Sequence, residues 1–272
     1  MCITQQGIET ISLFQIPVAK VTEKEAVERI LGMVREGRDA AQSGQRRRTR
    51  MVATLNVDFV ANAVSGWPFG GNTELWGYLK SADLVTADGM PIVLLSKLLF
   101  RPLPERVAGA DLVPALCRRC AEEGLRVYVL GCERDAVEEA FRRMEAVSEN
   151  SRAILSGHDT SIVNLDEERT EIVERINSAK PDLLFVALGN PKQELWMGRN
   201  IGKLEVPVMM GIGGTFNFLA GRVKRAPRWM QRCGLEWIYR IIQEPGRLWR
   251  RYAYGLVKFS WLSLRSILGG YR

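Results

Sequence analysis

Short apolar runs alternate with longer amphipathic stretches along this chain of 272 residues. Runs that are apolar at successive positions are typical of strands buried on both faces of a sheet. They predict strands at Ile11–Val18, Met51–Leu55, Leu84–Thr86, Arg126–Leu130, Leu183–Leu188 and Val206–Met210. Apolar residues spaced three and four apart predict helices at Glu23–Glu36, Asp58–Ser65, Met90–Phe100, Asp135–Val147 and Leu165–Ser178, and another that ends at Glu123. The repeated strand–loop–helix order predicts an α/β fold, in which a Rossmann-like parallel sheet carries helices on both faces.

Sheets of this kind bind ligands beyond the carboxyl ends of their strands. The residues that follow the expected strands are therefore candidate site residues, and this inference uses topology alone. They are Thr54, Asn56, Asp88, Gly131, Asn190, Gln193, Glu194, Gly213, Gly214 and Asn217.

Each polar candidate has a functional and a structural interpretation. Asp88 stands between a strand and a glycine, so its carboxylate either points into the ligand cleft as a base or caps the turn. Thr54 and Asn56 offer a hydroxyl and an amide to sugar hydroxyls, or they satisfy hydrogen bonds at a strand end. Gln193 and Glu194 follow a proline at a helix start, where they either bind a ligand or cap the helix.

Composition places this chain among soluble globular proteins, at 46% apolar and 25% charged residues, with length for one large or two small domains. The net charge of +7 is concentrated late in the chain, because residues 222–272 hold twelve Lys and Arg against two Glu. That segment carries +10 and the remainder −3. Its basic residues begin with Arg222, Lys224, Arg225, Arg228 and Arg232, directly after a glycine-rich stretch. Such a segment suits a phosphorylated substrate, an anionic lipid surface or nucleic acid, or it is a basic helix that only faces water.

The final helix shows two sides when residues 248–267 are placed on a helical wheel. One side holds Leu248, Trp249, Tyr252, Leu256, Phe259 and Ile267. The other side holds Arg250, Arg251, Lys258 and Arg265. This pattern predicts a basic amphipathic helix that lies in a membrane interface, although a core helix or a helix that seals an oligomer has similar spacing. We therefore expect an α/β domain over residues 1–245 and a membrane-associating helical tail over residues 246–272.

The sequence gives only weak signals for a redox, zinc or dinucleotide-binding site. Five scattered cysteines fit reduced thiols, and Cys117 and Cys120 form a CxxC without the second pair that a zinc site needs. The only histidine, His158, stands in a polar, loop-like stretch and is expected on the surface. The short GCE and GIGG loops lack a full dinucleotide fingerprint. No basic leader and no run of about 18 apolar residues is present, so we expect a cytoplasmic protein without a membrane-spanning helix. No metal-ligand cluster is visible in the sequence either, and we expect no cofactor.

Five motifs carry a resemblance to a known family. They are TLNVDF, TADGMP, ERVAGAD, LGNPKQE and GGTFNFLAGRVKRAPRWMQRCGLEWIYRIIQEPGRLWRRY. With them, the stretch from Ile11 to Tyr252 resembles the WecG/TagA/CpsF glycosyltransferases, glycosyltransferase family 26. The resemblance implies a Rossmann-like fold of the GT-E type. It also implies an inverting, metal-independent hexosyltransferase that moves a sugar from a UDP-sugar to a polyprenyl-diphosphate-linked acceptor. Such enzymes make bacterial teichoic acid, common antigen or exopolysaccharide at the inner face of the cell membrane.

The resemblance also implies roles for individual residues. Asp88 becomes the general base, Arg106 a catalytic arginine, and Thr54 and Asn56 lie near the sugar and the nucleotide base. Gln193 belongs to the PKQE motif. The late arginines, with candidates Arg240, Arg247, Arg250 and Arg251, close over the diphosphate. Arg225, in the basic segment before them, is a further candidate for substrate binding. This chain has Asn217 where many members have an aspartate, which removes any carboxylate role there.

Two other functional classes are consistent with parts of the pattern. A basic segment also suits a non-catalytic adaptor for a membrane surface or nucleic acid, although no recognised nucleic-acid module is present. The strand–loop–helix order also suits a nucleotide-dependent oxidoreductase. The partners that we expect are a UDP-sugar, a polyprenyl-diphosphate-linked sugar, an anionic inner membrane surface and a second copy of the chain, with no nucleic acid.

Overall fold

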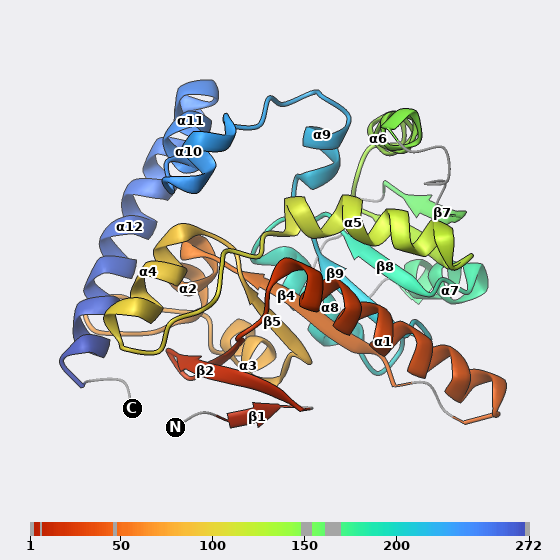
Figure 1. Ribbon diagram of the computed structural model, residues 1–272, viewed down its shortest axis with the longest axis horizontal. Helices are drawn as coiled ribbons and strands as arrows, with labels where there is room; N and C mark the ends of the chain where they lie inside the picture. Colours follow the sequence, from red (N-terminus) through yellow and green to blue (C-terminus); the bar gives the residue numbers. More distant parts are fainter. Residues whose placement is uncertain (1–2, 6, 46–47, 148–153, 161–169, 270–272) are drawn as a thin grey trace. The chain divides into compact units, whose positions relative to one another are not determined.

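A computed structural model describes residues 3–5, 7–45, 48–147, 154–160 and 170–269 (Figure 1). A six-stranded sheet flanked by helices has the strand order β5-β4-β9-β8-β6-β7. Its strands are β4 (Arg50–Leu55), β5 (Leu84–Ala87), β6 (Arg126–Leu130), β7 (Ile154–Asp159), β8 (Leu183–Val186) and β9 (Val208–Gly211). The pairs β4–β9, β9–β8, β8–β6 and β6–β7 run parallel. The predicted Rossmann-like α/β fold is therefore confirmed.

A second, antiparallel sheet has the order β1-β2-β3, with β1 at Ile3–Gln5, β2 at Ile8–Leu13 and β3 at Ile16–Ala19. The helices are α1 (Glu23–Gln42), α2 (Val57–Ala63), α3 (Thr73–Ser81), α4 (Met90–Leu98), α5 (Gly109–Glu122), α6 (Arg134–Val147), α7 (Thr170–Ala179), α8 (Lys192–Asn200), α9 (Thr215–Leu219), α10 (Arg228–Arg232), α11 (Glu236–Gln243) and α12 (Pro245–Ile267). Within the described residues, none of these helices is long and apolar enough to span a bilayer.

The chain divides into two compact units, and the division falls within β4. Unit 1 comprises Met1–Thr22, Thr54–Ala108 and Lys224–Arg272, and unit 2 comprises Glu23–Ala53 and Gly109–Val223. The expectation of a separate tail from residue 246 stays a prediction, because this grouping follows spatial contacts rather than function.

Unit 2 contains the central strands of the parallel sheet. Every residue of β8 and β9 is buried, as expected for strands that are covered on both faces. Phe185 of β8 meets Phe216 of α9 with ring centroids 6.2 Å apart. Helix α1 buries its apolar stripe, including Ile30 and Leu31, as the spacing predicts, and continues six residues beyond the predicted end at Glu36.

Unit 1 holds the antiparallel sheet, β5, the end of β4 and helices α2–α4 and α10–α12. Helix α12 lies against α2 (Figure 1). Its inward face contains Leu248, Phe259 and Leu262, all buried, together with Lys258, whose exposed fraction is 0%. The Lys258 ammonium donates hydrogen bonds to the carbonyl oxygens of Ala61 and Gly70.

This packing corrects the interpretation of the final helix. The wheel placed Lys258 on a water-facing side, whereas Lys258 is buried. Arg251, on the same side of the wheel, is 44% exposed and pairs with Asp58 of α2. Leu248 and Phe259, expected to face lipid, are buried against the protein instead. The outward face of α12 is largely apolar, with exposed Trp249, Leu256, Val257, Trp261, Leu264 and Ile267. Lys258 turns inward because backbone carbonyls there accept its hydrogen bonds.

Several element predictions differ from the structure. The strand expected at Ile11–Val18 is a hairpin, turning at Phe14 and Gln15, which adopt left-handed φ values of 54° and 63°. Helix α3 and strand β7 were not predicted. His158 lies in β7 and is half-buried, so its prediction as a surface loop residue was wrong. The helix expected from Leu165 is described only from Thr170, because residues 161–169 lie outside the described part of the chain.

Candidate active site

In unit 1, the carboxyl ends of β4 and β5 bring three predicted site residues into one neighbourhood. The backbone N–H of Asp88 donates to the carbonyl of Leu55 at 2.8 Å, which continues the pairing of the two strands. Thr54 is buried near the end of β4. Asn56 caps α2 by accepting a hydrogen bond from the N–H of Phe59 at 3.2 Å. Residues that carry a hydroxyl, an amide and a carboxylate therefore lie at the ends of these two neighbouring strands.

Asp88 directly precedes the first residue of the turn into α4. Gly89, with φ of 124°, is the N-cap of α4, and that cap has no side-chain hydrogen bond. A Cβ at Gly89 would lie 4.0 Å from Cβ of Asn56, so this turn passes close to the end of β4. Only glycine adopts such a φ without strain. The Asp88 side chain is 27% exposed, which leaves its carboxylate accessible to a ligand.

Arg106 stands beside this carboxylate. The N–H of Val107 donates to the carbonyl of Ala87 at 2.8 Å, and this bond fixes residue 106 next to the end of β5. The guanidinium Nη1 lies 3.9 Å from Oδ1 of Asp88 and 4.0 Å from Oε2 of Glu236. Both distances are ion-pair contacts rather than close hydrogen bonds. The predicted base and the predicted catalytic arginine are therefore neighbours.

Segments late in the sequence complete the charged surroundings in unit 1. Nε of Arg225 lies 3.7 Å from Oε1 of Glu236, so two arginines share one carboxylate. Arg251 of α12 contacts Oδ2 of Asp58 at 2.8 Å, in the first turn of the helix that Asn56 caps. The result is an alternating arrangement of guanidinium and carboxylate groups around the ends of β4 and β5.

The remaining predicted arginines are less tightly placed. Arg240 lies on α11, one turn after Glu236, and its charge lowers the pKa of Tyr252, although burial raises that pKa more. Arg250 of α12 lies 5.4 Å from the ring of Trp249. Arg247 belongs to α12, but its side chain lies outside the described part of the structure.

In unit 2, the predicted polar residues bind the protein's own loops. The carbonyl oxygen Oε1 of Gln193 accepts hydrogen bonds from the N–H of Gly189 at 3.1 Å and of Gly213 at 2.9 Å. Asn190 donates to Oε2 of Glu194 at 2.9 Å. These bonds tie the loop after β8 to the loop after β9. The Gln193 side chain thus binds these two loops in this structure rather than projecting from them.

Glu194 is a carboxyl group in an enclosed environment. Its exposed fraction is 0%, and burial raises its pKa to about 7, although hydrogen bonds from Gln193, Asn190 and the backbone act in the opposite direction. A Cβ on Gly211 would lie 2.6 Å from Nε2 of Gln193 and 2.8 Å from Oε1 of Glu194. Only glycine therefore fits at the end of β9 beside these two side chains.

The other unit 2 candidates are loop positions at strand ends. Gly131, with φ of 87°, follows β6, and its N–H donates to the carbonyl of Asp159 at 2.7 Å. Gly213 has φ of 52° and Gly214 is the N-cap of α9. Asn217 lies in α9 and is partly exposed. They follow β6 and β9, as the topology predicts.

The model of the Glycosyl transferase WecG/TagA/CpsF family matches residues 11–272. This chain belongs to that family. One relative is the N-acetylglucosaminyldiphosphoundecaprenol N-acetyl-beta-D-mannosaminyltransferase of Bacillus spizizenii (strain ATCC 23059 / NRRL B-14472 / W23), 33% identical over 191 residues, which are 70% of this chain and 72% of the relative. Proteins of the same name in Bacillus subtilis (strain 168) and Staphylococcus aureus (strain MW2) are 30% and 33% identical, over 74% and 63% of this chain and 74% and 66% of the relatives. The predicted family resemblance is confirmed.

The site motifs of this WecG/TagA/CpsF family member fall into two sets. Thr54, Asn56, Asp88, Arg106 and the late arginines belong to unit 1. Gly131, Asn190, Gln193, Glu194, Gly213, Gly214 and Asn217 belong to unit 2. Sequence reasoning did not find Asp58 or Glu236, which hold Arg251, Arg106 and Arg225. Their only signal was a position in the first turn of a helix, which many acidic residues share.

Of the cysteines in the described part of this family member, Cys117, Cys120 and Cys132 are buried and Cys233 is exposed. Cys117 and Cys120 are buried in α5, and burial raises the pKa of Cys117 well above its usual value and that of Cys120 to about 12. Thiols with such pKa values stay protonated, whereas redox chemistry and metal binding need the thiolate. Among the described residues, no group of three or more His, Cys, Asp and Glu side chains is arranged to hold a metal ion.

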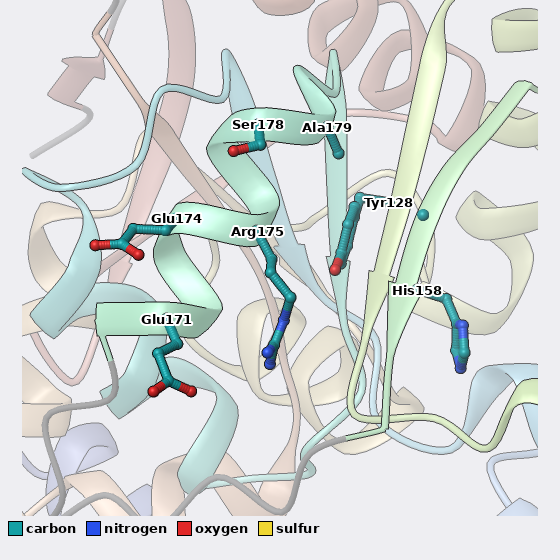
Figure 2. Close-up of a pocket in the computed structure, with 8 residues that line it drawn as sticks. Tyr128, His158, Glu171, Glu174, Arg175, Ser178 and Ala179 are labelled. Carbon is teal, nitrogen blue, oxygen red and sulfur yellow. The ribbon is translucent and has the colours of Figure 1, made fainter.

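One pocket of about 590 Å³ lies elsewhere in unit 2, between α7 and the strands β6 and β7 (Figure 2). Nη2 of Arg175 lies 2.6 Å from Oδ2 of Asp159, and Tyr128 packs beside Gly157. In Figure 2, the strand that carries His158 separates its ring from Arg175. None of the residues that line this pocket was a predicted site residue, and Arg175 is already satisfied by an ion pair.

Proposed function

We propose that this chain is an inverting hexosyltransferase that moves a hexose or N-acetylhexosamine from a UDP-sugar to a sugar on a polyprenyl diphosphate, in bacterial surface-polysaccharide synthesis. Membership of a glycosyltransferase family supports the reaction class. The names of the relatives support an acceptor such as N-acetylglucosaminyldiphosphoundecaprenol, and make N-acetylmannosamine the first donor sugar to test.

Asp88 is the proposed base, and its position is the observation that carries the proposal. Its carboxylate accepts the proton of the acceptor hydroxyl while the oxygen attacks the anomeric carbon. The bond from that carbon to the diphosphate oxygen breaks, and UDP leaves with the electron pair. A partly exposed carboxylate at the carboxyl end of β5, beside Arg106, supports this role.

Arginines supply the positive charge that the leaving diphosphate needs. Arg106, held beside Asp88 by the bond between Val107 and Ala87, is the proposed catalytic arginine. Arg225, Arg240, Arg247, Arg250 and Arg251 are proposed to close around the diphosphate. Guanidinium groups suit this task, because their planar donors match phosphate oxygens in pairs.

The other predicted residues are proposed to bind the substrates. Thr54 and Asn56 offer a hydroxyl and an amide to the sugar and the nucleotide base. In unit 2, Gly131, Asn190, Gly213, Gly214 and Asn217 are proposed as substrate-binding residues, because ligands bind beyond strand carboxyl ends. Gln193 and Glu194 hold those loops in shape.

We propose that the protein acts at a membrane surface. The acceptor is a lipid, and the exposed apolar face of α12 suits the boundary between head groups and acyl chains. We propose that the protein is peripheral on the inner face of the cell membrane, where the late arginines add attraction to anionic lipids.

The test is a panel of UDP-sugars with N-acetylglucosaminyldiphospho-polyprenol, followed by release of UDP and by mass analysis of the glycolipid. We expect one UDP-N-acetylhexosamine or UDP-hexose to give a disaccharide lipid, with or without chelator. Absence of glycolipid with every donor would favour the non-catalytic adaptor, and activity restored only by added manganese would refute the metal-independent mechanism.

A further inference from the structure

Exposed large apolar side chains are concentrated in unit 1. Of the sixteen among the described residues, only Leu155 and Ile201 belong to unit 2. Several of the others lie on α12, but Leu94, Leu98 and Phe100 form a separate group on α4 and the turn that follows it. Clustered exposed apolar groups usually mark an interface.

Phe100 is the most exposed of them, at 92%, and it is held in a strained conformation. Its φ is 55°, in the left-handed region that favours glycine. The N–H of Phe100 donates to the carbonyl of Lys97 at 3.0 Å, and that of Arg101 to Ser96 at 2.9 Å. These two bonds are the Schellman pattern, in which the position of Phe100 is normally a glycine. An aromatic residue that is both strained and exposed points to a function outside the fold.

The turn is fixed by polar contacts, so Phe100 is not needed to hold it. The hydroxyl of Ser96 donates to the carbonyl of Val93 at 2.7 Å and accepts from the N–H of Leu103 at 3.0 Å. The hydrophobic contact that often accompanies a Schellman turn would join positions 96 and 101, which here are a serine and an arginine. The turn therefore presents Phe100 to solvent on a rigid support.

The charges beside Leu94, Leu98 and Phe100 favour a lipid bilayer over a second copy of the chain as the partner of this surface. Residues 94–104, LLSKLLFRPLP, contain Lys97 and Arg101, both exposed, and no acidic residue. A second copy of the chain docked about a two-fold axis would place these like charges against each other. An anionic bilayer instead accepts the cations at its head groups and the apolar side chains beneath them.

We propose that the α4 tip, residues 94–102, inserts into the head-group boundary of an anionic bilayer as a second anchor beside α12. The proposal rests on the proposed function, because it supposes a lipid-linked acceptor. Asp88 directly precedes the cap of α4, and a helix of nine residues is about 13 Å long. Helix α4 is thus a spacer that holds the base within about 13 Å of the membrane contact, near the depth of a lipid-linked diphosphate.

The test compares the full-length protein with Phe100→Gly in binding to vesicles of phosphatidylcholine with and without phosphatidylglycerol. Glycine relieves the left-handed strain, so this variant is expected to unfold at the same or a higher temperature. We expect its affinity for the anionic vesicles to fall about tenfold, the effect of removing one inserted aromatic side chain. The matched control is Ile201→Ser, which removes an exposed apolar residue from unit 2 and is expected to bind like the parent.

Two further measurements separate the outcomes. Turnover with a short-chain, water-soluble acceptor is expected to be equal for Phe100→Gly and the parent, so a failure of the proposed function would appear in the parent itself. A fluorophore on Phe100→Cys, with Cys2 and Cys233 replaced by serine, is expected to shift to the blue when anionic vesicles are added. Unchanged vesicle affinity together with an unshifted fluorophore would overturn the proposal, and so would a dimer that Phe100→Gly alone dissociates.

Discussion

Lys258 offers the sharpest test of how α12 is attached to unit 1. The change is Lys258→Met, which keeps a long unbranched side chain but removes the ammonium that binds the carbonyl oxygens of Ala61 and Gly70. Because methionine fills nearly the same volume, the variant isolates the polar contribution from cavity formation.

The size of the effect follows from these two hydrogen bonds. A hydrogen bond to a charged group contributes about 1.5–3 kcal/mol, and a buried carbonyl left without a donor costs about 1–3 kcal/mol. Against this, burial lowers the pKa of Lys258, so the lysine itself carries a desolvation cost that methionine removes. We expect a net loss of about 2–4 kcal/mol, which is a large part of the stability of a typical domain.

The assay is urea unfolding combined with hydrogen exchange of the α12 amides. We expect a lower unfolding midpoint and faster exchange in α12, while β8 and β9 remain protected. The matched control is Lys24→Met, at an exposed position of α1, which is expected to leave both measurements unchanged. Equal stability and equal α12 protection in Lys258→Met would refute the inference that the buried ammonium holds this helix.

Two further predictions concern unit 2. Gly211→Ala places a Cβ within 2.8 Å of both Gln193 and Glu194, so we expect turnover to fall at least about tenfold, whereas Gly202→Ala, with no atom within 4 Å, is expected to be neutral. Equal kcat/KM for the two variants would contradict this. Burial raises the pKa of Glu194 from 4.5 to about 7, so the folded protein binds a proton that the unfolded chain has already lost in this pH range. The unfolding free energy is therefore expected to fall by about 3 kcal/mol as the pH rises from 4.5 through 7. The unfolding free energy of the parent should therefore fall relative to Glu194→Gln between pH 5 and pH 8, and parallel pH profiles would show that the carboxyl group stays charged.

The sequence predicted the central sheet because its signal is local. Runs such as LLFVAL are short and apolar on both faces, a pattern that is typical of buried parallel strands. The polar edge strand β7, with the sequence ILSGHD, has no such run and resembles a loop. The first hairpin was missed because Phe14 and Gln15 turn the chain without the glycine or asparagine that usually marks such a turn.

Site residues could be predicted where the order of strands along the chain is enough to place a residue at the end of a strand. Asp88 follows β5 directly, so topology placed it at the carboxyl end of the sheet. The association of Arg106 with Glu236 joins residues 130 positions apart, and no local pattern encodes it. The prediction of which face of α12 is buried was wrong for a similar reason. Both faces of the helix carry apolar residues, and only its packing on α2 decides which one is buried.

The most direct measurement of the proposed reaction is the single-turnover rate of glycolipid formation by Asp88→Asn, with the donor sugar identified from the panel. Asparagine keeps the size of the side chain but cannot accept the proton, so we expect a rate at least about a hundredfold below the parent, with donor affinity and unfolding temperature unchanged. Glycolipid formation by Asp88→Asn at the parental rate would show that this carboxylate is not the base.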